Sequence, residues 1–188
     1  DRNYMLLQRL YAGARNIPRY LMPVIEPEDM AEFERKIREG HLDIFSPDAW
    51  NTLFSKRFPD YGELQGERGR DWVTLGLKDG SLTDDVIPAR IERIPARQLQ
   101  PTQNQLWFDK VVDYLIEHGL PGPGSPATET PIIASRELNI LDGHHRHGQV
   151  VLANPDLGMR VLLVPLPLDL LLDVGRSYGA AIGRQPNF

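Results

Sequence analysis

The sequence predicts an α+β fold: a small mixed sheet with flanking helices, preceded by a mainly helical N-terminal extension that contains a hairpin. Strand-like runs at 90–99 and 159–166 enclose an amphipathic helix at 106–118, which indicates the α+β part. Helix start and stop signals dominate the first half of the chain. Asp79-Gly80 between two strand-like runs predicts the hairpin, over 72–87.

These patterns divide the chain into three parts. Residues 1–88 form the extension, 89–174 the main domain, and 175–188 a tail rich in glycine and polar residues. Pro88 marks the border between the first two parts. The 188 residues are enough for one domain with its own core plus an extension.

The extension is predicted to contain three helices. The second begins at Pro27 and stops before Gly40, and the third begins at Ser46. The first is basic and amphipathic, and either docks on a partner or an anionic surface, or packs on its own domain. Its apolar residues at helical spacing are Tyr4, Leu7, Leu10 and Tyr11.

In the main domain, Arg90–Leu99 alternates in polarity as a strand does and leads into a polar loop at 100–105. The helix at 106–118 has a broad apolar stripe. Met159–Leu166 is apolar on both faces, as in a strand that is covered on both sides. A further apolar segment continues to Val174.

The most informative stretch is a predicted strand-to-helix junction within Ile140–Gly148. Pro131–Ala134 predicts one strand and Ile140-Leu141 another, and Gly143 predicts a tight turn before a helix that runs to Asn154. The first N–H groups of a helix have no partner within it, and the helix dipole adds about half a positive charge there. Such a position binds phosphate or carboxylate readily.

Residues of catalytic types gather at this junction. Gly143 lets the backbone approach a ligand closely, and Arg146 can grip phosphate oxygens through two hydrogen bonds. His144 or His145 can contact phosphate or move a proton. Asp142 can cap the helix, bind a metal ion or accept a proton. The alternative is that Asp142 is only a cap and that the histidines form a solvated first turn.

The motif Ile-Leu-Asp-Gly-His-His-Arg, after a strand of the type Pro-Ile-Ile-Ala, resembles the signature of the ParB/sulfiredoxin-like superfamily. The Asp-Gly-His-His-Arg form is similar to ParB-like nuclease-domain proteins and to the free-serine kinases of the same fold. The resemblance covers about Ile91 to Leu172, and Ile94–Pro101 is similar to the first strand and loop of that fold. Members include CTP-dependent DNA clamps, ATP-using sulfinic-acid reductases, kinases of free serine and nucleases.

The resemblance implies nucleotide binding more strongly than it implies one reaction, because the family binds phosphates at this loop and helix start. The phosphates of ATP, ADP or CTP would lie on the amides of Gly143 to Arg146, with Arg146 neutralising their charge. Asp142, His144 and His145 would be the catalytic residues of phosphoryl transfer or nucleotide hydrolysis, and Asp142 would hold Mg²⁺ or orient the attacking group. The acceptor would be water, a small molecule or a protein.

Two features depart from known members of the family. Serine kinases of this fold place a carboxylate in the loop that here contains Gln103. An amide cannot act as a general base, but Gln103 can hold a substrate or a ribose. The helix-turn-helix region of full-length ParB proteins does not follow the motif, so the resemblance does not extend to a centromere-binding protein.

Composition restricts the partners and the compartment. The net charge of −5 disfavours binding of bare DNA, although a local basic patch can still bind it. The absence of cysteine excludes disulfides, thiolate zinc sites and cysteine nucleophiles, and fits a reducing compartment. Because no apolar run is long enough to span a membrane and no signal-peptide pattern opens the chain, we expect a cytoplasmic protein, or one within a virus particle if a phage encodes it.

Two other functions compete with nucleotide chemistry. The chain begins at Asp1, so it can be a processed piece, and the site can belong to a non-catalytic module of a larger phage or mobile-element protein. The other possibility is a ParB-like nuclease, in which Asp142 with His144, His145 and His147 would hold a divalent metal.

Overall fold

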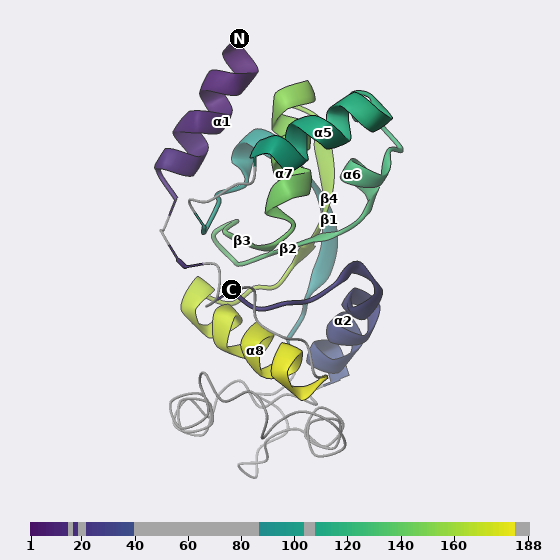
Figure 1. Cartoon of the computed structure of the whole chain (residues 1–188). Coiled ribbons are helices and arrows are strands. Elements are labelled where there is room, and N and C mark those ends of the chain that lie inside the picture. Colours follow the sequence, from purple (N-terminus) through teal and green to yellow (C-terminus); the bar gives the residue numbers. More distant parts are fainter. Residues whose placement is uncertain (15–16, 19–21, 40–86, 104–107, 183–188) are drawn as a thin grey trace. The chain divides into compact units, whose positions relative to one another are not determined.

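The computed structural model of the chain describes residues 1–14, 17–18, 22–39, 87–103 and 108–182. The chain divides into two compact units. The first, here called the sheet unit, consists of residues 1–19 and 90–163; the second, here called the helical unit, consists of residues 20–89 and 164–188. The predicted α+β class is confirmed, since a four-stranded sheet is flanked by helices (Figure 1).

The sheet unit contains most of the elements predicted for the main domain, together with the first predicted helix. In chain order these elements are α1 (Arg2–Ala12), β1 (Arg90–Pro95), the 3-10 turn η4 (Ala96–Gln98), α5 (Phe108–His118), α6 (Pro126–Glu129), β2 (Ile132–Ala134), β3 (Ile140–Asp142), α7 (His144–Ala153) and β4 (Gly158–Leu163). The predicted helix at 106–118 is present from Phe108 onwards, and its first residues lie outside the described ranges.

The sheet is mixed, with the strand order β1-β4-β2-β3. β1 and β4 are antiparallel, β2 and β4 are parallel, and β2 and β3 are antiparallel. In the centre, Val161–Leu163 of β4 are all buried, as expected for a strand covered on both sides, but β4 ends at Leu163 instead of the predicted Leu166 and Arg160 is exposed. Beyond β3, the loop at Gln100 pairs with Asn139 and brings residues 100–103 to the end of that strand.

Helix α1 packs on α7, and this packing corrects the predicted division at residue 88. Leu7 and Tyr11 of α1 are buried in the core that β1, β2, β4 and α7 share. Residues 1–19 therefore belong to the sheet unit and not to a separate extension. The sequence showed the apolar spacing of α1 but could not show which surface that face would cover, because periodicity carries no information about the partner.

The described part of the helical unit is built on α2 (Met30–Glu39) and α8 (Leu168–Ala181). A 3-10 turn, η2 (Pro27–Asp29), opens α2, and Pro27 at its first position agrees with the predicted start. The rings of Phe33 and Tyr178 meet edge to face with centroids 5.2 Å apart. The Tyr178 hydroxyl also donates to Glu32 at 2.9 Å.

Helix α8 shows that the predicted tail, 175–188, was placed too early. The sequence suggested a tail because glycine weakens helices, but tertiary packing outweighs this preference. Tyr178 is buried against Phe33, and Gly179 lies so close to the Val24 backbone that a side chain would crowd it. Residues 175–181 are therefore helical.

The third predicted helix, at Ser46, lies outside the described residues, as does the predicted hairpin at 72–87 except for Ile87. Among the helices that are described, none has the length and apolar character needed to cross a membrane.

Candidate functional site

The predicted junction of strand, glycine turn and helix is present. β3 ends at Asp142, Gly143 precedes α7, and α7 begins at His144. Gly143 has a φ of 105° and a ψ of 21°, a left-handed conformation that residues with a side chain avoid. A Cβ on Gly143 would overlap the Cγ2 atom of Ile132 on β2. Glycine is therefore required at this position by both conformation and space.

The first turn of α7 has an unusual charge pattern for a helix start. Helices normally place acidic residues there to match the positive end of the dipole. The first turn of α7 contains no acidic residue, and its N-cap residue, Gly143, has no side chain that could cap it. Its side chains are instead His144, His145 and Arg146. The positive end of the dipole and the Arg146 guanidinium together favour an anion at this position.

The structure buries His144 and gives it a local partner. The backbone N–H of Thr102 donates to His144 Nε2 at 3.1 Å, so this nitrogen is an acceptor and the ring proton lies on Nδ1. Burial, with smaller contributions from His147 and His145, lowers the pKa of His144 well below its usual value. His144 is thus a neutral residue that fastens the loop at 100–103 to the helix start.

His147 is buried in the same way, one turn further along α7. Its Nε2 lies 2.8 Å from the Ala96 carbonyl oxygen, which can only accept, so Nε2 carries the proton. Its Nδ1 lies 3.2 Å from the hydroxyl oxygen of Tyr11. Burial lowers the pKa of His147 to about 4, while the hydrogen bond to Ala96 opposes this shift. The ring therefore stays neutral at physiological pH.

The Arg146 side chain bonds to other groups of the protein. Its Nη1 donates to the carbonyl oxygens of Thr130 at 2.6 Å and Pro131 at 3.0 Å, which ties α7 to the connection between α6 and β2. Its Nη2 pairs with the Asp142 carboxylate at 3.4 Å. The bidentate phosphate grip expected from the sequence would have to replace these bonds. The backbone N–H of Arg146 remains part of the helix start.

The other predicted residues of the site differ in how far they are exposed. The side chain of Asp142 is 26% exposed, and His145 is half-buried. Gln103 is buried and follows directly after Thr102, whose hydroxyl donates to the Ile140 carbonyl oxygen at 2.6 Å. The loop at 100–103 therefore lies beside the end of β3.

The structure fits a magnesium ion held by Asp142 better than it fits the predicted metal cluster of a nuclease. The described ranges contain no group of three or more histidine or acidic side chains able to hold a metal ion. His147 directs both ring nitrogens at protein groups, which conflicts with the nuclease cluster that combined it with Asp142. A magnesium ion often takes only one or two carboxylates and completes its shell with substrate phosphates and water, and Asp142 could serve in this way.

Two residues of the junction were missed by the sequence analysis. Thr102 bonds to His144 and to Ile140, although Gln103 was the residue chosen from that loop. The Tyr11 hydroxyl donates to the His144 carbonyl oxygen at 2.9 Å, across a separation of 133 residues. The only available signal for Tyr11 was its place on the apolar face of a helix, which does not distinguish a packing residue from a hydrogen-bond donor.

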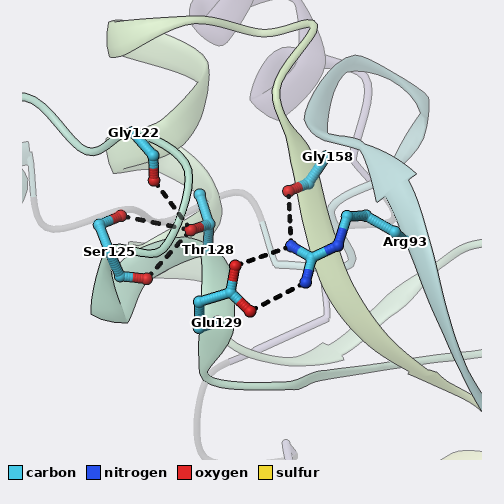
Figure 2. Close-up of polar contacts among 6 residues, drawn as sticks. All are labelled: Arg93, Gly122, Ser125, Thr128, Glu129 and Gly158. Atoms are coloured by element: carbon cyan, nitrogen blue, oxygen red, sulfur yellow. Dashed lines mark hydrogen bonds and ion pairs between the residues drawn. The ribbon is translucent and has the colours of Figure 1, made fainter.

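A second polar cluster of the sheet unit lies on its surface and fastens α6 (Figure 2). The Arg93 guanidinium forms two hydrogen bonds with the Glu129 carboxylate, at 3.0 and 2.9 Å, and a third with the Gly158 carbonyl oxygen at 3.3 Å. Beside it, the hydroxyl of Thr128 donates to the carbonyl oxygen of Gly122 or of Ser125, each 3.0 Å away.

A cavity of about 610 Å³ lies in the sheet unit at the opposite end of α7 from Gly143. Its lining comes from α1, Arg97 and the turn at 153–156. None of the residues predicted for the site lines it, so the cavity does not belong to the junction.

Comparison with known proteins adds no identification. No protein-family model matches the chain, and neither the curated proteins nor the solved structures contain a significant match. The functional argument therefore rests on the junction itself.

Proposed function

We propose that the chain is a ParB/sulfiredoxin-like protein that binds a nucleotide at the start of α7 and transfers or hydrolyses its terminal phosphoryl group. The observation that carries the proposal is the first turn of α7. It follows a glycine that no other residue can replace without strain, it contains no acidic residue, and its N-cap residue is that glycine and not a capping side chain. A phosphate would supply the negative charge that such a helix start favours.

Each residue of the junction would have its own role in binding or catalysis. The backbone amides from Gly143 to Arg146 would hold phosphate oxygens, and the half-buried His145 would contact them or supply a proton. Asp142 would hold Mg²⁺ or orient the attacking water or hydroxyl. Gln103 would hold the ribose or a substrate. His144 would keep the loop at 100–103 in register with the helix.

The mixed four-stranded sheet with flanking helices supports the ParB/sulfiredoxin-like assignment, as does the loop at 100–103 that lies beside the helix start. Phosphoryl transfer needs mainly positioning and charge stabilisation, so a small set of groups is sufficient for it. The nucleotide would be ATP, ADP or CTP.

Nucleotide binding without turnover is the alternative that one observation favours. The rings of His144 and His147 are buried and neutral, and the Arg146 guanidinium is bonded to Thr130 and Pro131. Of the proposed catalytic residues, Asp142 and His145 are the partly exposed ones. A non-catalytic module would retain the amide site and lack a reaction.

The test is phosphate release from ATP and CTP, with and without Mg²⁺, measured for the wild type, Asp142→Asn and Asp113→Asn. Asp113 is an exposed carboxylate on α5 and serves as the matched control. The proposal predicts Mg²⁺-dependent release that falls at least ~100-fold in Asp142→Asn and is unchanged in Asp113→Asn. Binding without release in the wild type would support the module, and the absence of both binding and release would refute the proposal.

A further inference from the structure

We propose that Tyr11, on α1, is a positioning residue that orients and polarises the first peptide group of α7 for phosphate binding. The inference rests on the proposed function, because the group that Tyr11 holds is part of the proposed phosphate site. Tyr11 itself does not reach the ligand position, since its side chain is buried between α1 and α7.

The Tyr11 hydroxyl bonds to the site through the backbone. It donates to the His144 carbonyl oxygen at 2.9 Å, and the same hydroxyl oxygen lies 3.2 Å from His147 Nδ1. The Tyr11 ring also packs against both histidine rings, with centroids 6.2 Å from His144 and 5.9 Å from His147. One side chain from a distant part of the sequence therefore contacts the first two turns of α7.

The bonded carbonyl has a direct link to the phosphate site. The carbonyl group of His144 and the N–H group of His145 belong to the same peptide unit. A hydrogen bond accepted by the carbonyl oxygen polarises this unit and makes its N–H a stronger donor. The His145 N–H is one of the amides proposed to hold phosphate. Tyr11 would therefore strengthen that donor as well as fix its direction.

Helix α1 is held so that Tyr11 cannot shift easily. At the other end of α1, the Asn3 side chain donates to the Leu152 carbonyl oxygen at 2.9 Å, near the end of α7. The two helices therefore run antiparallel, with a hydrogen bond at each end. His147 adds a third point, because its bond to the Ala96 carbonyl oxygen ties the same face of α7 to η4.

The protonation state of Tyr11 suits this role. Burial raises the pKa of its hydroxyl, so Tyr11 remains a neutral donor throughout the physiological range. It can therefore neither exchange protons with a substrate nor become a competing negative charge beside the site.

The test compares Tyr11→Phe, which removes only the hydroxyl oxygen, with two control variants. Tyr4→Phe makes the same change on the exposed side of α1, where the hydroxyl accepts from Gln8. Ile94→Val shortens a buried side chain on β1 and lowers stability without changing the Tyr11 hydroxyl. For each protein, the dissociation constant of ATP with Mg²⁺ and the backbone amide NMR spectrum are measured at a temperature at which all of them are folded.

We expect Tyr11→Phe to weaken ATP binding about five- to tenfold, because the His145 amide loses both its polarising bond and its fixed direction, and to move the His145 amide resonance. Tyr4→Phe and Ile94→Val should bind ATP within about twofold of the wild type. Equal weakening in Ile94→Val and Tyr11→Phe would show that lost stability alone accounts for the effect, and would overturn the proposal.

Binding by the wild type and by Tyr11→Phe separates this proposal from the proposed function. If the wild type binds no nucleotide, the proposed function fails, and a shifted His145 amide in Tyr11→Phe then shows only that the hydroxyl polarises that peptide unit. If the wild type binds ATP and Tyr11→Phe binds it equally well, the positioning role fails and the proposed function stands.

Discussion

The sheet unit contains two polar clusters that differ in burial far more than in geometry. The cluster at the α7 start joins Tyr11, Thr102, His144 and His147 through polar contacts of 2.9 to 3.2 Å, all in the interior. The surface pair of Arg93 and Glu129 has bonds of 3.0 and 2.9 Å, and its side chains are 51% and 37% exposed. Distances alone would rank the two clusters as equals.

The difference in burial decides which cluster contributes more to stability. A buried polar group that loses its partner keeps the full cost of its removal from water, whereas an exposed one simply bonds to solvent. An exposed ion pair is further weakened by screening and by the loss of side-chain freedom. The α7 cluster should therefore control both stability and the geometry of the candidate site, while the surface pair should do little more than restrain α6.

The largest effect is expected from Gly143→Ala, which acts on the backbone that the buried cluster supports. Alanine at a φ of 105° would be strained, and its Cβ would overlap Ile132. We expect a loss of about 3–5 kcal/mol in the free energy of unfolding, together with loss of nucleotide binding. Denaturant unfolding measures the first effect and calorimetry the second.

Gly122→Ala is the matched control, because nothing lies within 4 Å of a Cβ at that position. It should leave both quantities close to those of the wild type. A Gly143→Ala protein as stable as Gly122→Ala would show that the α7 start tolerates a side chain and is not a constrained site.

The next effect is a pH dependence that only the buried cluster should produce. His147 has a pKa of about 4 in the folded chain and an ordinary value of 6.5 when unfolded. Between these values the unfolded chain binds more protons, so the free energy of unfolding is at its full value above about pH 6.5 and decreases as the pH falls towards 4. The loss from this group approaches about 3 kcal/mol, and His144 adds to it in the same direction.

Urea unfolding at several pH values from 7 to 4.5 measures this dependence. Carboxyl groups whose pKa is lowered on folding, such as Glu129 and Asp156, add a loss in the same direction only towards the acid end of this range. His147→Gln removes one of the titrating groups and should flatten the curve. An equally steep curve in His147→Gln would assign the pH dependence to other groups.

The smallest effect is expected from Arg93→Met, which breaks the surface pair. Arg93 and Glu129 are exposed, and water can replace each bond (Figure 2). The midpoint of a thermal melt should change by no more than about 1–2 °C, and nucleotide binding should be unchanged. A large loss in Arg93→Met would mean that the attachment of α6 supports the Thr130 and Pro131 carbonyls that Arg146 binds, and would remove the contrast between the two clusters.

The sequence was sufficient to predict the junction because its signals are local. Asp-Gly after an apolar run predicts a turn, and the glycine has the positive φ that such a turn requires. The elements β2, β3, α7 and β4 follow from apolar runs of the right lengths. The same local signals predicted that Asp142 and His145 would stand at the helix start.

The roles of the remaining residues depend on contacts that no local pattern contains. His144 and His145 are neighbours in sequence, yet the helix turns the first inward to Thr102 and leaves the second half-buried. Arg146 was expected to face a ligand but reaches the carbonyls of residues 130 and 131, which only the path of the α6–β2 connection places there. Tyr11 joins the site over 133 residues, so its role required the packing of α1.

The most direct test of the account is a titration of ¹⁵N-labelled protein with ATP and Mg²⁺, followed through the backbone amide resonances. The account predicts that the resonances of Gly143 to Arg146 move first and furthest, that Gln103 follows, and that Arg93 and Glu129 stay in place. Shifts centred on the cavity beside Arg2 and Arg9, or no shifts at millimolar ATP, would contradict the claim that the start of α7 is a phosphate site.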